Sequence, residues 1–466
     1  MDQPPSTCRH AVVIGGSIAG LLAARVLSDH FQRVTIIERE TLAQSDAPRQ
    51  AVPQGRHVHV LLHQGIQIVR NLFPDLVPAL TDSGLELADT SRDFRWRHFG
   101  VWKTRITTGI DVLFLNRPLF EWSVASRVSR IPGIGVLENS EVTRLIATPD
   151  RRRVTGLAVR TAAAVERELG ADLVVDASGR GSQMPQWLKS LGLPAPDETI
   201  VEVNVGYASR FYRRPANLAD GRALFVQPRP PNTRGAAVFP IDGNRWLVTL
   251  AGWLADYPPT NDNGFLEFAG SLEVPDVRIA LEQAEPLTPA CIYKFPANRR
   301  RHYEKLNELP EGLVILGDAL CSFNPVYAQG MTVAALEAIT LDQWLRNPEE
   351  QGGARKNGLA RRFHQQASKI VDASWRAAVG EDLRYPGVTG HRPFGTGLAH
   401  WYSGLIHKAT AHDAYVAREF YKVLHLTAPP SLLFQPGVLL RVLASACRGS
   451  ASNAGQAGLN IASNVN

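Results

Sequence analysis

The chain contains 466 residues, 44% of them hydrophobic and 20% charged, with a formal net charge of +6, a composition that is ordinary for a soluble globular protein of two or three domains. Its four cysteines lie far apart without a Cys-x-x-Cys pair, which excludes a disulfide framework and favours a reducing compartment. No apolar run reaches the about 18 residues that a transmembrane helix needs, and the short basic runs lack interleaved aromatic residues. We therefore expect a cytoplasmic protein without a nucleic-acid partner.

The first 40 residues carry the most informative pattern. An apolar run at 11–14 predicts a buried strand, and a glycine-rich turn follows at 15–20. Helical spacing of the next apolar residues then leads to a second apolar run at 34–37, which ends on Glu38. This strand–turn–helix–strand unit is typical of dinucleotide binding, because free N–H groups at the start of the helix face the pyrophosphate.

Single residues in this unit support the same interpretation. Gly15 permits the tight turn, and Gly20 lets the helix and the strand pack closely. Glu38 lies at the distance from the turn that suits hydrogen bonds to the adenosine ribose. Ser17 replaces the usual middle glycine, and its small side chain can donate a hydrogen bond to phosphate.

The next part of the chain predicts further strands and two helices. A helix-like pattern covers 58–73, and alternation at 92–115 predicts strands that line a pocket. A second helix opens at Asn116, with Pro118 in its first turn. The segment 136–159 predicts two strands around a basic turn.

The composition and the predicted secondary structure change in the second half of the chain. A buried strand is predicted at 173–176, and a period-two, aromatic-rich pattern at 201–253 surrounds an Asp-Gly-Asn hairpin signal at 242–244. This pattern predicts an inserted antiparallel sheet. From Met331 onward the chain is mostly helical, and after about Arg448 it becomes small and polar, so we expect a disordered tail.

A second informative stretch runs from Leu316 to Thr332. A strand is predicted to end at Gly317, which places Asp318 at the carboxyl edge of the sheet, where α/β proteins bind ligands. A carboxylate there can accept hydrogen bonds from ribityl hydroxyls. The loop at 325–330 then starts a helix whose N–H groups and positive dipole end would stabilise a flavin ring that becomes negative on reduction.

Taken together, these stretches resemble the FAD-dependent aromatic hydroxylase and epoxidase superfamily. The nearest resemblance is to the bacterial flavin epoxidases of polyether polyketide biosynthesis, with a more distant similarity to squalene epoxidase. The resemblance covers nearly the whole chain, and beside the first turn it rests on Arg49, Val52-Pro53-Gln54, His57, His59, residues 173–182, Asn298-Arg299-Arg300, His302-Tyr303, Gly317-Asp318, Asn324-Pro325-Val326-Tyr327 and Tyr385-Pro386-Gly387.

The resemblance implies an α/β fold with a Rossmann-like FAD-binding domain, an inserted antiparallel-sheet substrate domain and a helical C-terminal region. The expected boundaries are 1–90, 116–194 and 296–346 for the FAD-binding domain, 91–115 and 195–295 for the substrate domain, 347–448 for the C-terminal helices and 449–466 for the tail.

The resemblance also implies the residues of the site. Arg117 would reach the phosphate or ribityl region, Val142 would offer its backbone to adenine, and Arg49, the candidate catalytic residue, would lie close to the flavin. The full set expected to bind FAD is Gly15, Gly16, Ser17, Ala19, Gly20, Glu38, Arg39, Arg49, Arg117, Val142, Asp318, Pro325, Ala328, Gly330 and Met331.

Three aromatic residues, Trp96, Phe211 and Trp253, are candidates for the lining of an apolar substrate cavity, the alternative for each being an ordinary place in the core. No metal is expected. His57, His59 and His63 lie close together in the sequence, but no carboxylate or cysteine completes a ligand set.

Two departures from the family pattern bear on the reaction. Hydroxylases that NADPH reduces directly usually carry Asp-Gly where this chain has Ser178-Gly179, so electrons from NAD(P)H would arrive either directly or through a separate flavin reductase. Aromatic hydroxylases commonly have Asn at the position of Thr332. The run Gly-Met-Thr-Val-Ala at 330–334 is similar to squalene epoxidase and favours an alkene as the oxygen acceptor.

The resemblance thus implies an FAD-dependent monooxygenase that uses O2, through a flavin C4a-hydroperoxide, to epoxidise C=C bonds of a large apolar polyketide or terpenoid. Three other enzyme classes remain open: a hydroxylase of an aromatic polyketide, a flavin-dependent halogenase, and a geranylgeranyl-reductase-like ene reductase. The Trp-x-Trp-x-Ile-Pro motif expected of a halogenase is absent around 96–102. The non-enzyme alternative is an FAD-binding accessory protein.

Overall fold

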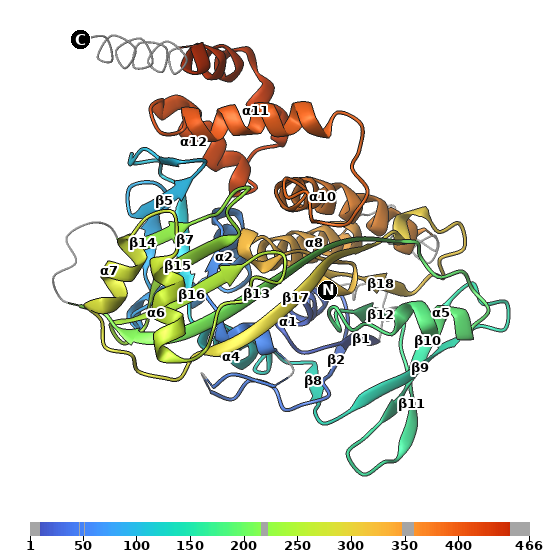
Figure 1. Cartoon of the computed structure of the whole chain (residues 1–466). Coiled ribbons are helices and arrows are strands. Elements are labelled where there is room, and N and C mark those ends of the chain that lie inside the picture. Colours follow the sequence, from blue (N-terminus) through green and yellow to red (C-terminus); the bar gives the residue numbers. More distant parts are fainter. Residues whose placement is uncertain (1–9, 46, 51, 216–221, 347–357, 448–466) are drawn as a thin grey trace, which may run out of the picture.

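A computed structural model describes residues 10–45, 47–50, 52–215, 222–346 and 358–447. Figure 1 shows a parallel sheet covered by helices, a large antiparallel sheet beside it, and a group of C-terminal helices at one end of the molecule. The predicted fold class is confirmed. The predicted tail at 449–466 lies outside the described residues.

The nucleotide-binding half is built on a five-stranded parallel sheet in the order β18-β12-β1-β2-β8. Its strands are β1 (His10–Ile14), β2 (Arg33–Ile37), β8 (Ile134–Leu137), β12 (Leu173–Asp176) and β18 (Leu313–Ile315). The central strands β1 and β12 are buried along their whole length, as expected of a parallel sheet with both faces covered.

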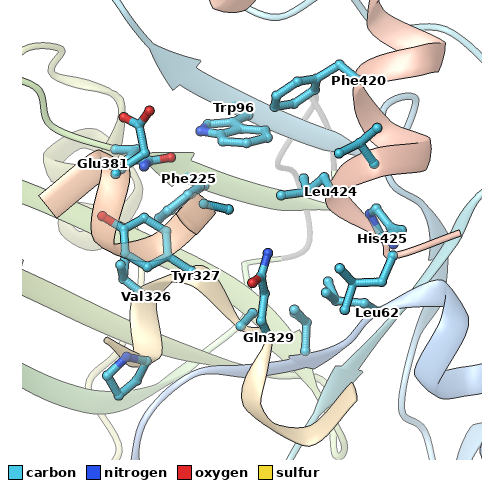
Figure 2. Close-up of a pocket in the computed structure, with 18 of the residues that line it drawn as sticks. Leu62, Trp96, Phe225, Val326, Tyr327, Gln329, Glu381, Phe420, Leu424 and His425 are labelled. Atoms are coloured by element: carbon cyan, nitrogen blue, oxygen red, sulfur yellow. The ribbon is translucent and has the colours of Figure 1, made fainter. Parts of the chain in front are cut away.

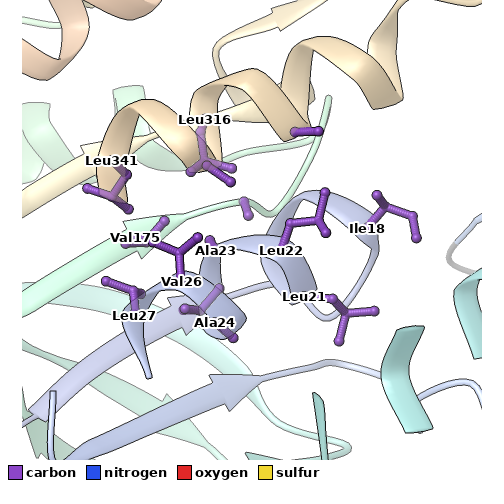
Figure 3. Close-up of a cluster of buried hydrophobic side chains, with 14 of the residues drawn as sticks. Ile18, Leu21, Leu22, Ala23, Ala24, Val26, Leu27, Val175, Leu316 and Leu341 are labelled. Carbon is purple, nitrogen blue, oxygen red and sulfur yellow. The ribbon is translucent and has the colours of Figure 1, made fainter. Parts of the chain in front are cut away.

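Helix α1 (Ile18–Leu27) connects β1 to β2, so the predicted strand–turn–helix–strand unit is confirmed. It packs against α8 (Gly330–Arg346), and Figure 3 shows its apolar side chains among Val175, Leu316 and Leu341. This packing fixes the start of both helices at the same edge of the sheet.

The predicted long helix at 58–73 is wrong in its first part. Residues His59–Leu61 form the short strand β3, and α2 begins only at His63 and ends at Leu72. The reason is tertiary: β3 pairs with β7 (Asp111–Leu115), which lies beside β4 (Leu87–Asp89) in a three-stranded sheet.

The segment 136–159 also differs from its prediction. It contributes to two different sheets, because its first residues belong to the parallel strand β8. The basic turn joins β9 (Glu141–Ala147) to β10 (Val154–Arg160), and β11 (Glu166–Gly170) completes a three-stranded antiparallel sheet.

The predicted antiparallel sheet has eight strands in the order β19-β17-β13-β16-β15-β14-β5-β6, and one pair within it, β14 with β5, is parallel. The Asp-Gly-Asn hairpin joins β15 to β16 as predicted. The strands are β5 (Phe94–His98), β6 (Val101–Trp102), β13 (Glu198–Arg213), β14 (Ala223–Val226), β15 (Arg234–Ile241), β16 (Arg245–Gly252), β17 (Cys291–Arg301) and β19 (Cys321–Ser322).

The remaining helices cover these sheets. Around the nucleotide-binding half and the large sheet they are α3 (Leu76–Asp82), α4 (Arg117–Val128), α5 (Met184–Ser190), α6 (Asp262–Gly270) and α7 (Asp276–Glu282). Toward the C-terminus they are α10 (Leu359–Asp382), α11 (Thr396–Ala409), α12 (Ala414–Leu424) and a last helix at 436–447. Short 3-10 turns occur at Pro53–Arg56, Tyr303–Lys305, Gly317–Ala319, Pro325–Tyr327 and Pro430–Phe434. Among the described helices, none is long and apolar enough to cross a membrane.

Candidate active site

The carboxyl ends of the parallel strands form a groove. Gly15 adopts a φ of 101°, and a side chain there would lie 2.6 Å from the carbonyl oxygen of Ala177; glycine alone accommodates both conditions. At Gly20 a Cβ atom would lie 1.9 Å from the carbonyl oxygen of Gly15. These two glycines allow α1 to begin directly beside β1, so that its first N–H groups face the groove.

A charged network surrounds this turn. Glu38, at the end of β2, accepts a hydrogen bond from the Gly16 N–H at 2.7 Å and pairs with Arg49 at 3.0 Å. Glu121 pairs with Arg49 at 2.8 Å and with Arg117, one turn away on α4, at 3.3 Å. Glu121 was not among the predicted site residues, although its position four residues after Arg117 is a usual spacing for an ion pair on a helix.

These contacts place Arg49 beside Glu38, the carboxylate that is expected to bind the ribose. Its guanidinium also donates to the Gly16 carbonyl oxygen at 3.4 Å. This position favours a contact with the nucleotide part of the cofactor over one with the flavin ring. The catalytic role of Arg49 stays a prediction.

Asp318 lies at the other side of the groove, just after β18. Its carboxyl is accessible from the groove yet lies deep in the protein, and this burial raises its pKa while Arg117 and Arg180 oppose the shift. Because β12 and β1 separate β18 from β2, Asp318 and Glu38 follow strands about 14 Å apart. A ligand that contacts both carboxylates must extend across the sheet.

The loop from Pro325 to Gln329 leads into α8. Ala328 has a φ of 56°, and the Asn324 side chain accepts a hydrogen bond from the Val326 N–H at 3.3 Å. The side-chain carbonyl of Gln329 is buried without a hydrogen-bond partner among the described residues. The loop therefore presents the Gln329 side-chain carbonyl and the free N–H groups at the start of α8 to the groove.

The structure brings the predicted cofactor residues into one groove of about 570 Å³. Gly20 does not line it, and it acts through the close helix–strand contact instead. Residues that line the groove but were not predicted include Ser178, Arg180, Tyr293 and Phe295. Binding of FAD by these residues stays a prediction.

The donor set fits an FAD molecule. The glycine turn suits a pyrophosphate, Glu38 suits a ribose, and Asp318 suits ribityl hydroxyls. Arg180 supports this fit, because its buried Nη1 has no hydrogen-bond partner within the described chain.

A second, larger cavity of about 1220 Å³ adjoins the groove. Figure 2 shows Trp96, Phe225, Leu424 and other mostly apolar residues around it. Trp96 and Trp253 line it, and their role in binding substrate stays a prediction. The α10–α12 part of its wall was not predicted, because the apolar face of an amphipathic helix does not indicate which part of the protein it packs against.

Phe211 does not line the cavity, and its role in binding substrate stays a prediction. It lies near the end of β13, farther along the strand than the cavity residue Tyr207, and its ring packs under the guanidinium of Arg245.

The cavity and the groove share a boundary. Eight residues line both: Gln54, Val58, His59, Val60, Tyr293, Pro325, Ala328 and Gln329. A molecule in the cavity therefore lies against the loop and helix start that face the groove.

The histidines near this boundary are structural hydrogen-bonding groups. His57 Nδ1 lies 2.7 Å from Ser209 Oγ, and His59 Nδ1 lies 2.8 Å from the His57 carbonyl oxygen. Burial lowers the pKa of His57 to about 4 and that of His59 to about 3, so both are neutral at pH 7. The described residues contain no group of three or more side chains suited to hold a metal ion.

Comparison with known proteins decides the family. The profile of a family described as FAD binding domain matches residues 9–378. The chain belongs to this family.

One curated relative and several solved structures agree with this assignment. Protein Rv3254 of Mycobacterium tuberculosis is 33% identical over 388 residues, which is 80% of each chain. A flavin-dependent brominase superposes with a TM-score of 0.65 at 12% identity, covering 96% of this chain and 99% of its own. The p-nitrophenol 4-monooxygenase PnpA of Pseudomonas putida gives 0.61 at 17% identity, covering 90% and 99%. At these identities the two structures establish the fold alone.

Proposed function

We propose that this family member is a cytoplasmic FAD-dependent monooxygenase that epoxidises C=C bonds of a large apolar polyketide or terpenoid. The observation that carries the proposal is the cavity of about 1220 Å³ that meets the FAD groove along Pro325, Ala328 and Gln329. Such a volume exceeds the upper end of ordinary ligand pockets, about 1,000 Å³.

When bound, FAD supplies the activation of O2. The chain's own residues perform three tasks in this proposal. Ser17, Arg117 and the start of α1 hold the phosphates, and Ala328 to Met331 direct N–H groups toward the ring. The apolar walls exclude water and orient the alkene, which needs no acid or base from the protein.

Thr332 bears on the oxygen acceptor only through the family pattern. It is fully buried, its Oγ1 lies 2.7 Å from the position that a Cβ added at Gly65 on α2 would take, and it lines neither the groove nor the cavity. The preference for an alkene therefore rests on the similarity of residues 330–334 to squalene epoxidase.

Incubation of the purified holoprotein with NADPH, a flavin reductase and isotopically labelled O2 tests the reaction. The probes are squalene, cis-parinaric acid and the anthraquinone emodin, analysed by mass spectrometry with and without bromide. We expect one labelled oxygen in a polyene product that acid opens to a diol. Four results would each overturn the proposal. A labelled phenol from emodin alone would indicate an aromatic hydroxylase, and bromination would indicate a halogenase. Saturation of a polyene without O2 would indicate an ene reductase, and bound FAD without substrate-dependent O2 uptake would indicate an accessory protein.

We also expect NADPH alone to reduce the bound flavin slowly. Ser178 stands where directly reduced hydroxylases carry Asp, and its hydroxyl donates to Asp176 at 2.6 Å, so it offers no free carboxylate. Anaerobic stopped-flow absorbance should show rapid bleaching only when a flavin reductase is added. Rapid bleaching by NADPH alone would show that the reductase is unnecessary.

A further inference from the structure

A buried lysine lies behind the wall of the cavity opposite the FAD groove. Figure 2 shows Trp96 and Phe420 across the cavity from Gln329. Behind them lies Lys103, which is only 5% exposed. Its Nζ lies 4.5 Å from the centroid of the Trp96 ring and 4.7 Å from that of Phe420.

The hydrogen bonds of this lysine go to uncharged groups. Nζ donates to Thr410 Oγ1 at 2.9 Å and to His407 Nδ1 at 3.1 Å. Within the described chain it forms no ion pair. A buried ammonium without a carboxylate is unusual, because desolvation is normally offset by an opposite charge.

The charged groups around Lys103 leave a positive excess. Glu381 of α10 attracts it from a distance, but Glu381 is itself paired with Arg384 at 2.8 Å. His98 of β5 lies beside His407, with ring centroids 4.6 Å apart. Arg384 and Arg229 add positive potential at His98, and no described carboxylate faces this histidine closely.

The tautomer of His407 follows from the lysine. Since Nδ1 accepts the hydrogen bond from Lys103, a neutral ring carries its hydrogen on Nε2. Burial and Lys103 hold the pKa of His407 well below its ordinary value, so the ring is neutral. His407 lines the cavity, and its Nε2 has no hydrogen-bond partner among the described residues.

We propose that Lys103 and His407 form a subsite that binds a carboxylate of the substrate at the end of the cavity opposite the flavin. His407 Nε2–H donates to the carboxylate, and Lys103 supplies the opposite charge. The proposal rests on the assignment of this cavity to the substrate, and it narrows the substrate class to long apolar alkenes with an acidic head group.

Fluorescence titration of the holoprotein with cis-parinaric acid and with its methyl ester tests the subsite. We expect the wild type to bind the acid about tenfold more tightly than the ester. Lys103→Met should remove this preference, and so should His407→Phe, which keeps the aromatic packing. Lys408→Met is the matched control, because Lys408 is exposed on the same helix, and it should keep the preference.

The pH dependence gives an independent readout. Burial lowers the pKa of Lys103 to about 7, so the free protein loses the ammonium above that pH. The preference for the acid should therefore decline between pH 7 and about 9, because a bound carboxylate raises the pKa of the lysine. The affinity for the ester should stay constant over the same pH range, because the ester carries no charge.

The outcomes separate the two proposals. Equal affinity for acid and ester in the wild type, or a preference that persists in both Lys103→Met and His407→Phe, would overturn the subsite and leave the cavity assignment standing. Failure to bind either ligand would overturn the cavity assignment itself. Retention of the flavin absorbance in each variant establishes that it is folded, and either variant alone suffices for the comparison.

Discussion

Gly20→Ala is expected to yield a protein that is purified without FAD. The added methyl group would lie 1.9 Å from the Gly15 carbonyl oxygen, and neither partner is a flexible side chain that could move aside. Helix α1 would have to shift away from β1, which disturbs both the core around Leu21 and Leu22 and the N–H groups at the turn. We expect a loss of about 3 kcal/mol in the free energy of unfolding.

The measurements are flavin absorbance after purification and urea denaturation of the apoprotein. Gly397→Ala is the control, because a Cβ there meets nothing within 4 Å and the residue lies in helix α11. Alanine should stabilise this position by up to about 1 kcal/mol. A Gly20→Ala protein with full FAD content would refute the packing argument at the turn.

The second large effect is expected at Asp382, the last residue of α10. Its fully buried carboxylate accepts hydrogen bonds from four side chains: Trp253 Nε1 at 3.2 Å, Asn298 Nδ2 at 2.8 Å, Asn324 Nδ2 at 3.0 Å and Tyr327 Oη at 2.8 Å. Two of these partners, Asn324 and Tyr327, belong to the segment that presents residues 325–329 to both the groove and the cavity. Asp382 therefore positions that loop from the C-terminal helical region.

Asp382→Ala would leave several buried donors without an acceptor, and we expect a loss of about 3–5 kcal/mol in the free energy of unfolding. In the variant that remains folded at low temperature, displacement of the loop should lower the rate of substrate oxygenation about 100-fold. Asp75→Asn is the control, because this carboxylate is 74% exposed and pairs only with Arg127 at the surface. Its effect should stay within about 1 kcal/mol.

The same residue should make stability depend on pH. Burial raises the pKa of Asp382 to about 6 from an ordinary value of 3.8, although its four hydrogen bonds oppose the shift. The folded protein thus binds a proton that the unfolded chain releases, so the contribution is present below about pH 4 and is lost as the pH rises through 6. Relative to Asp382→Asn, the wild type should lose about 2 kcal/mol between pH 4 and pH 7 in urea titrations. Parallel stability profiles for the two proteins would contradict this assignment.

The parts of the fold that local sequence patterns determine could be predicted. The turn from Gly15 to Gly20, the acidic end of β2 and the Gly317-Asp318 step each combine glycine chemistry with the end of a strand, and all line or support one groove. The short strand β3 could not be separated from α2, because the apolar residues Val60, Leu61 and Leu62 directly before the helix look like its first turn. Its pairing with β7 settles the difference.

The cavity wall depends on contacts that are distant in sequence. Lys103 and His407 are 304 positions apart, and Asp382 and Trp253 are 129 apart. A lysine before a polar stretch, or an aspartate at the end of a helix, is unremarkable in isolation. Only the docking of α10 and α11 against the eight-stranded sheet turns these residues into buried groups with defined partners.

The loop that lines both the groove and the cavity has a practical consequence for protein engineering. Because Pro325, Ala328 and Gln329 belong to the two linings at once, the proposed function implies that a substitution there alters substrate choice and the redox environment of the flavin together. Under the same proposal, attempts to redirect the substrate specificity should begin at Trp96 and Phe420, which line the cavity and not the groove.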